Sequence, residues 1–103
     1  MFDKKEACNL KDLPFVSVVV PVRNEEKFIG KCVESLLNGT YPKDKLEILV
    51  VDGMSEDETR KIVERYERKY PHVVKLLKNE KLYTPCGLNI GIKNSRGDIV
   101  MVA

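Results

Sequence analysis

Phe15-Val-Ser-Val-Val-Val20 is a nearly apolar run, rich in β-branched residues, that ends at Pro21. Its residues do not alternate between apolar and polar, which indicates a strand buried on both faces, as in parallel sheets. Leu46-Glu-Ile-Leu-Val-Val51 is a second run of this kind. Residues 73–77 and 99–102 are rich in aliphatic side chains and complete a set of four predicted strands.

Helical patterns separate the predicted strands. Apolar residues at helical spacing predict a helix over residues 24–39, with Asn24 as its N-cap. Ser55 and Glu58 have the S-x-x-E spacing of a capping box, which predicts a second helix over residues 56–69.

A third helix is predicted from Thr84–Pro85 to Asn94, because a capping residue followed by proline is typical of a helix start. The order is therefore β-α-β-α-β-α-β. Such alternation implies right-handed crossovers and an α/β fold of three layers, a mainly parallel four-stranded sheet with helices on both faces. We expect residues 1–14 to form a polar lead-in and residues 15–103 to form one Rossmann-like domain.

Composition excludes several classes of protein. The chain has 103 residues, of which 43% are hydrophobic and 33% charged, and this balance argues against disorder. The net charge is +2, with Lys and Arg scattered among acids, so no nucleic-acid partner is expected. Motifs of the types GxGxxG, GxxxxGK[ST] and GxSxG are absent, which argues against dinucleotide-binding, P-loop and serine-hydrolase proteins.

The cysteines and the N-terminal residues bear on the cellular setting. Cys8, Cys32 and Cys86 are widely spaced and form neither a CxxC pair nor a metal-binding pattern, so we expect a reduced, cytoplasmic setting. Charges throughout the first 13 residues argue against a signal peptide. No apolar run approaches the ~20 residues that a membrane-spanning helix needs.

Candidate ligand-binding residues follow the predicted strands, because open α/β sheets bind ligands beyond the carboxyl ends of their strands. Asp52 directly follows an apolar strand. Its carboxylate either accepts hydrogen bonds from a ligand, or caps the following turn while Gly53 supplies unusual backbone angles. The pattern alone leaves both interpretations open. Helix capping is a sufficient explanation for Asn24 and Glu25.

Three sequence blocks resemble those of the family 2 glycosyltransferases of GT-A fold. Val18-Val-Val-Pro-Val-Arg-Asn-Glu25 is similar to VxVPxxNE, and Ile48-Leu-Val-Val-Asp-Gly-Met-Ser-Glu-Asp-Glu-Thr59 is similar to VVDDGSxDxT. Thr84-Pro-Cys-Gly-Leu-Asn-Ile-Gly-Ile92, followed by Arg96-Gly-Asp-Ile-Val100, is similar to ALNxGI and GDxI. The blocks cover residues 15–103 in the order and spacing of the family. Gly53-Met54 and Thr84-Pro85 resemble a subgroup that builds exopolysaccharides.

The resemblance implies roles for individual residues. Pro21, Val22 and Asn24 would line the base and ribose of a nucleotide, although many family members have an aromatic residue where this chain has Val22. Glu25 would hold the ribose or the loop, and Asp52 would accept a hydrogen bond from the base. Two further site residues are implied: Gly53 beside Asp52, and Lys81 as a phosphate or base contact, for which a solvated lysine is the alternative.

The resemblance also implies a function. The chain would bind the nucleoside diphosphate of a UDP- or GDP-sugar, within an inverting glycosyltransferase that acts on a glycan or lipid-linked acceptor at the cytoplasmic face of a membrane. The DxD motif that binds Mg²⁺ or Mn²⁺, and the general base, are expected beyond Ala103, so we expect no catalytic residue or metal ligand here and an inactive fragment. One alternative is a stand-alone nucleotide-binding or regulatory α/β module without catalysis. Another is an unrelated flavodoxin-like or Rossmann-like domain.

The last predicted strand, residues 99–102, leads to an expectation about assembly. The GT-A resemblance implies the strand order third, second, first, fourth, which leaves the fourth strand at the edge of the sheet. Unpaired apolar edges invite pairing with another chain, so we expect a homodimer through this edge.

Overall fold

A computed structural model of the chain describes residues 13–80 and 84–103. All four predicted strands and three predicted helices are present. The strands are β1 (Val16–Val22), β2 (Leu46–Asp52), β3 (Val74–Lys78) and β4 (Ile99–Val102). The helices are α2 (Ile29–Leu37), α3 (Thr59–Lys69) and α4 (Thr84–Asn94), with a short 3₁₀ helix, η2 (Lys43–Lys45), before β2.

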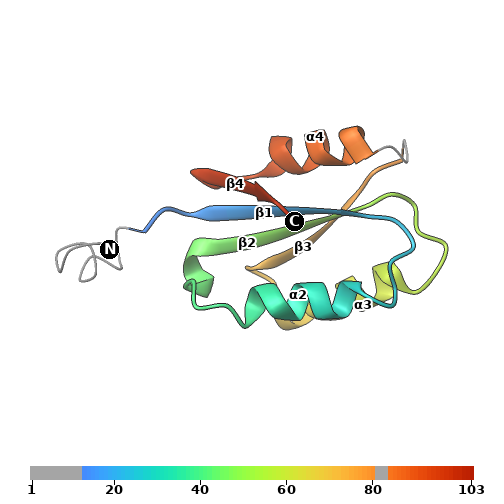
Figure 1. Ribbon diagram of the computed structural model, residues 1–103, viewed down its shortest axis with the longest axis horizontal. Coiled ribbons are helices and arrows are strands. Elements are labelled where there is room, and N and C mark those ends of the chain that lie inside the picture. The colour runs from blue at the N-terminus through green and yellow to red at the C-terminus, as the bar shows by residue number, and fades with distance from the viewer. Residues whose placement is uncertain (1–12, 81–83) are drawn as a thin grey trace.

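The strands form one parallel sheet in the order β3-β2-β1-β4. Figure 1 shows α4 on one face of the sheet and α2 and α3 on the other. The predicted α/β class, three-layer arrangement and strand order are therefore confirmed. Within the described part of the chain, β4 is one edge of this sheet and β3 is the other.

Apolar side chains pack on both faces of the central strands. All seven residues of β2 and the first five of β1 are buried. One face packs against α2 and α3, and its core includes Val18, Ile48 and Val63. The opposite face packs against α4, where Val19 and Leu49 contact residues such as Leu88. Burial on both faces explains why β1 and β2 are apolar runs without alternation.

Strand β1 continues past its predicted end, through Pro21 to Val22. β4 pairs with β1 only from Val16 to Val19. Among the described residues no strand pairs with this side of β1 at Pro21, so the missing N–H of the proline breaks no ladder hydrogen bond there.

Helix α4 approaches β1 closely because it carries glycine where it faces the strand. A Cβ atom on Gly91 would lie only 2.3 Å from Cγ1 of Val19, and one on Gly87 would lie 3.5 Å from Cβ of Pro21. No side chain fits at Gly91 without a shift of α4. The two glycines thereby determine the distance between α4 and the sheet.

Glu47 is a fully buried carboxylate at the amino end of the sheet. It accepts hydrogen bonds from Ser17 Oγ (2.6 Å) and from the backbone N–H of Arg96 (2.8 Å), and Lys75 Nζ lies 3.7 Å away. Burial raises the pKa of Glu47, but the hydrogen bonds from Ser17 and Arg96 and the Arg96 charge outweigh burial and hold it below its usual range. The carboxylate ties the segment before β4 to β1 and β2.

The helix starts differ from prediction. α2 begins at Ile29 and α3 at Thr59, and neither N-cap residue makes a side-chain capping bond. The predictions of Asn24 as the N-cap of α2 and of a Ser55–Glu58 capping box are therefore wrong. The side-chain oxygens of Asn24 and Ser55 bond instead with other loop residues, as described below.

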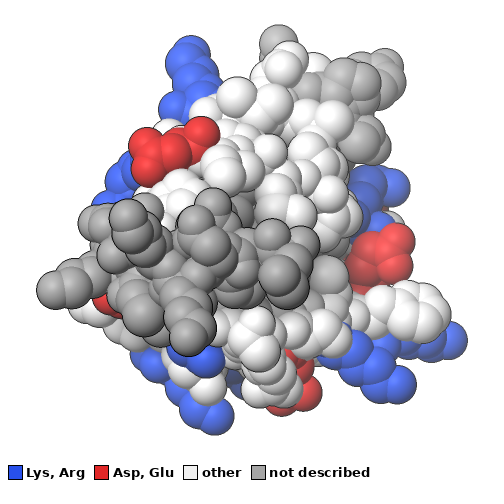
Figure 2. Space-filling view, turned by 60° about the vertical axis from the view of Figure 1, so that its left-hand side comes forward, with Lys and Arg blue, Asp and Glu red and all other residues white. Residues whose placement is uncertain are grey.

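The exposed edge strand carries an apolar surface. The side chains of β4 are between 38% and 57% exposed, and an apolar groove of about 340 Å³ lies between β4 and α2, lined by residues that include Leu36, Tyr41 and Met101. Figure 2, which turns the amino end of the sheet forward, shows white atoms, those of residues other than Lys, Arg, Asp and Glu, running from the top of the view through its right-hand half, with most charged side chains at the margins. No helix in the described part of the chain is long and apolar enough to cross a membrane.

Candidate functional site

The loops that follow β1 and β2 lie side by side at the carboxyl end of the sheet. Val22 and Asp52 are opposite each other in the register of the two strands. The N–H of Gly53 donates to the carbonyl oxygen of Val22 at 2.8 Å. The sheet thus brings together Pro21, Val22, Asp52 and Gly53, as the sequence predicted, with Asn24 and Glu25 in the adjoining loop.

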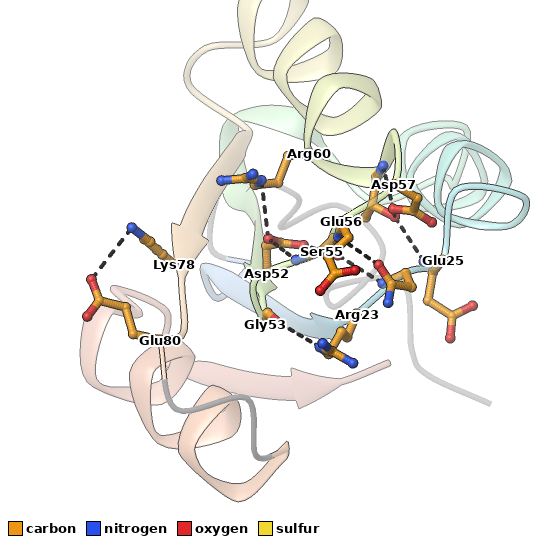
Figure 3. Close-up of polar contacts among 12 residues, drawn as sticks. Arg23, Glu25, Asp52, Gly53, Ser55, Glu56, Asp57, Arg60, Lys78 and Glu80 are labelled. Atoms are coloured by element: carbon orange, nitrogen blue, oxygen red, sulfur yellow. Dashed lines mark hydrogen bonds and ion pairs between the residues drawn. The ribbon is translucent and has the colours of Figure 1, made fainter.

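Asp52 is the central polar residue of this site, and only 1% of its surface is exposed. Its Oδ2 accepts the backbone N–H of Ser55 at 3.0 Å, and its Oδ1 accepts the Ser55 hydroxyl at 2.5 Å. Arg60 Nε lies 3.6 Å from Oδ2 (Figure 3). Asp52 therefore caps its own turn. Because a carboxylate has about four acceptor positions, these contacts do not occupy all of them.

Gly53 does not supply the unusual backbone angles that the sequence suggested. The positive φ belongs to its neighbour Met54, at 59°, and no described glycine has a positive φ. A Cβ at Gly53 would lie 3.4 Å from the carbonyl oxygen of Val22 and 3.6 Å from Cβ of Arg23, which are ordinary contacts, so crowding does not require glycine here either. Arg23 Nε donates to the carbonyl oxygen of Gly53 at 3.0 Å, so the two loops are held together at this point.

Asn24 lies opposite Ser55 and adopts the left-handed conformation, with φ at 54°. Its N–H donates to Ser55 Oγ at 2.9 Å, and its Oδ1 accepts the N–H of Glu56 at 2.8 Å. The N–H of Glu25 donates to Thr59 Oγ1 at 2.9 Å, while the exposed Glu25 carboxylate points away from Asp52. The loop after β1 is therefore bonded to the loop after β2 along its whole length.

Asp57 caps α3. Its carboxylate accepts the N–H of Thr59 at 2.9 Å and the N–H of Glu26 at 3.2 Å. Partial burial raises the pKa of Asp57, but hydrogen bonds from Thr59 and Glu26 outweigh burial and hold it below its usual range. Asp57 performs the capping that the sequence attributed to Ser55.

The third loop, after β3, contributes fewer described residues. Its first residue, Asn79, is buried, and its N–H donates to the carbonyl oxygen of Asp52 at 2.8 Å. Lys78 Nζ lies 3.6 Å from the Glu80 carboxylate. Lys81, predicted as a phosphate or base contact, lies outside the described residues.

An open cavity of about 710 Å³ lies beside Asp52, within the size range of ligand pockets. Its lining includes Arg23, Ser55, Arg60 and Glu80. Pro21, Val22, Asn24, Glu25, Asp52 and Gly53 do not line it; Asp52 instead bonds to Ser55 and Arg60, which do.

The sequence analysis did not assign Arg23 and Arg60 to the site, because an arginine in a loop or at a helix start is ordinarily exposed to solvent. The only available signal was their position, inside the first block and directly after the second.

Among the side chains that the structure describes, no group of three His, Cys, Asp or Glu residues lies close enough to hold a metal ion. Asp52, the acid nearest the centre, is already engaged with Ser55 and Arg60.

Comparison with known proteins gives a consistent result. The sequence model of a family described as glycosyl transferase family 2 matches residues 17–103. A dolichyl N-acetyl-α-D-glucosaminyl phosphate 3-β-D-2,3-diacetamido-2,3-dideoxy-β-D-glucuronosyltransferase from Methanococcus voltae is 39% identical over 89 residues, which are 85% of this chain and 28% of that protein.

Two solved structures resemble the fold. The mannosyltransferase PcManGT from Pyrobaculum calidifontis, in complex with GDP-Man and Mn²⁺, gives a TM-score of 0.80 at 31% identity, covering 88% of this chain and 27% of that one. TarS from Staphylococcus aureus, in complex with UDP-GlcNAc, gives 0.73 at 32% identity, covering 85% and 25%. The chain therefore spans less than a third of each relative.

Proposed function

The chain belongs to glycosyl transferase family 2, and we propose that it binds the nucleoside diphosphate of a sugar nucleotide as part of a longer glycosyltransferase. The observation that carries the proposal is Asp52, a buried carboxylate at the end of β2 beside a cavity of about 710 Å³. A carboxylate accepts hydrogen bonds only. It therefore suits a base that presents an N–H, such as uracil or guanine.

The residues around Asp52 support binding of a nucleotide. Pro21 and Val22 are half-buried at the end of β1 and supply an apolar flank for the base, and Gly53 leaves space beside it. Arg23 and Arg60 line the cavity and bring positive charge toward a diphosphate. We propose that Glu25 bonds the ribose and that Lys81 adds a phosphate contact.

The ligands of the relatives guide the choice of substrate. PcManGT was solved with GDP-Man and TarS with UDP-GlcNAc, so we propose a UDP- or GDP-sugar. The Methanococcus voltae relative is named for transfer to a dolichyl phosphate-linked sugar. We propose that the longer protein is an inverting enzyme that uses a glycan or lipid-linked acceptor at the cytoplasmic face of a membrane. Its Mg²⁺ or Mn²⁺ would be held by residues outside this chain.

Titration calorimetry of the chain with UDP and with GDP, each with MgCl₂, tests the proposal. Saturable binding of one nucleotide, lost in Asp52→Ala, is the expected result. FMN and NAD serve as controls, because they are the ligands of unrelated α/β folds. Binding of either in place of UDP and GDP would contradict the proposal. If a longer chain binds nucleotide without transferring sugar, the alternative of a regulatory module is favoured.

For the chain on its own, we also propose a homodimer through β4. Its four residues are apolar and exposed, and within the described chain one side of this strand has no partner. Such an edge is satisfied by another strand with free backbone groups and apolar side chains. The β4 strand of a second copy offers both.

A further inference from the structure

Asn24 forms two hydrogen bonds with the loop that follows β2. We propose that Asn24 is a positioning residue: it acts through Ser55 to hold the Asp52 carboxylate in one orientation before any ligand arrives. The ligand concerned is the nucleotide of the proposed function. We call this holding of the Asp52 carboxylate the bracing of Asp52, and it does not depend on which ligand binds.

A chain of hydrogen bonds connects Asn24 with Asp52. The Asn24 N–H donates to Ser55 Oγ at 2.9 Å, and Ser55 Oγ donates to Asp52 Oδ1 at 2.5 Å. A serine hydroxyl has one proton and two acceptor positions. Because one acceptor position is taken by Asn24, the proton is directed toward Asp52. Hydrogen bonds in such a chain also polarise and strengthen one another.

The Asn24 side chain holds its own backbone in the conformation that this chain of bonds needs. A φ of 54° is unfavourable for most residues but tolerated by asparagine. The side-chain Oδ1 accepts the N–H of Glu56 at 2.8 Å. Since Glu56 offers a donor, the facing atom of Asn24 is the oxygen, and the side chain ties the left-handed turn to the residue after Ser55.

The same geometry separates this role from a direct ligand contact. The Asn24 oxygen is engaged with Glu56, and its amide nitrogen has no hydrogen-bond partner among the residues that the structure describes. A direct contact would therefore use the amide N–H₂, whereas the positioning role uses only the oxygen. Asn24→Asp keeps an oxygen and loses the N–H₂, while Asn24→Gly loses both and still permits a positive φ.

Amide hydrogen exchange of the unliganded chain tests the bracing. In Asn24→Gly, the Glu56 N–H should exchange about three- to tenfold faster, the range that corresponds to one net hydrogen bond. In Asn24→Asp, exchange should stay within about twofold of the unaltered chain, because an acceptor remains. The Ile48 N–H, bonded to the carbonyl oxygen of Val73 at 2.6 Å, serves as an internal control. Equal Glu56 exchange in all three proteins would overturn the bracing.

Nucleoside binding tests the consequence for the ligand. Uridine and guanosine, followed by amide shift changes, are suitable probes because they carry no phosphate that the added charge of Asn24→Asp would repel. We expect Asn24→Gly to weaken binding about three- to tenfold and Asn24→Asp to restore it. Loss of binding in both variants would overturn the positioning role in favour of a direct contact through the amide nitrogen.

The two arms distinguish failure of this role from failure of the proposed function. Suppose that the unaltered chain binds no nucleoside or nucleotide, while the exchange rate of the Glu56 N–H still rises in Asn24→Gly. The proposed function then fails, and so does the predicted effect of Asn24 on ligand binding. The structural role of Asn24 in holding the loop stands. If the chain binds nucleotide and Glu56 exchange does not respond, the positioning role fails and the proposed function stands.

Discussion

Arg60 Nε lies 3.6 Å from Oδ2 of Asp52, with the arginine side chain 47% exposed and the aspartate side chain 1% exposed. A buried carboxylate is costly without a positive partner and hydrogen bonds. Arg60 and Ser55 supply both in the unliganded chain. The exposed arginine is the member of this pair that can move when a ligand donor approaches the carboxylate.

The first prediction compares two carboxylates of the same loop. Asp52→Ala should weaken nucleotide binding by ~1.5–3 kcal/mol, the contribution of a hydrogen bond to a charged acceptor. Asp57→Ala should weaken binding by clearly less. Both variants lose a carboxylate that accepts a backbone N–H a few residues further along the chain, so Asp57→Ala controls for the loss of such a contact. Calorimetry measures the difference, and equal affinities would remove Asp52 from the site.

The second prediction concerns catalysis. The resemblance implies that the metal-binding DxD motif and the general base lie beyond Ala103. Incubation of the isolated chain with several sugar nucleotides, Mn²⁺ and mixed acceptors should therefore give no glycoside above background. A reproducible, metal-dependent product would contradict this expectation.

The third prediction uses two helical glycines as a matched pair. Gly91→Ala places a Cβ 2.3 Å from Cγ1 of Val19, whereas at Gly30 the nearest atom, Cγ2 of Ile62, would be at 3.7 Å. Gly30→Ala should stabilise by ~0.5–1 kcal/mol through helix propensity. Gly91→Ala should instead destabilise by ~1–3 kcal/mol through overpacking. Urea denaturation measures both, and stabilisation by Gly91→Ala would show that α4 lies further from β1.

The fourth prediction concerns pH. Because the folded-state pKa of Glu47 is lowered, its contribution to stability is full above the unfolded-state pKa, about 4.3, and is lost as pH falls through the folded-state value. The unfolding free energy should therefore decrease from about pH 5 downward. Glu47→Gln should flatten this acid decline and cost ~1–3 kcal/mol at pH 7. Asp57 also has a lowered pKa, so Asp57→Asn serves as the comparison.

The fifth prediction concerns assembly. Sedimentation at micromolar concentration should show a dimer that dissociates on Val100→Lys, since a charge at an apolar edge opposes strand pairing. The short strand at the C-terminus has a competing tendency to fray. A clean monomer whose Ile99–Val102 amides exchange freely would exclude pairing through β4.

The strands were predictable because their signal is local to each segment. β1 and β2 are buried on both faces. Their apolar runs therefore predict both that these segments are strands and that the sheet is parallel. The helix starts were not predictable in this way. Ser55 and Asn24 have the composition of caps, but their side chains bond to each other's loop across about 30 residues of sequence. Only the folded sheet places these loops side by side.

The site was predictable in its position and less so in its details. The end of β2 and Asp52 follow from the rule for open α/β sheets. The position of the left-handed residue, at Met54 and not at Gly53, does not follow from this rule. The Arg60 ion pair also depends on the turn between β2 and α3, which brings a residue eight positions away back to the carboxylate.

The pairing of β1 with β4 has a consequence for the time course of folding. The bond between Gly97 N–H and Ser17 Oγ joins residues 80 positions apart. β1, β2 and β3 are contiguous in the sheet and precede β4 in the chain, so the other side of β1 has no β4 partner until residues 99–102 have been translated. Contacts between distant residues form slowly. A nascent chain therefore holds an open sheet edge on β1 from the synthesis of β1 until the synthesis of β4, and chaperone binding during that interval would protect this edge from pairing with other chains.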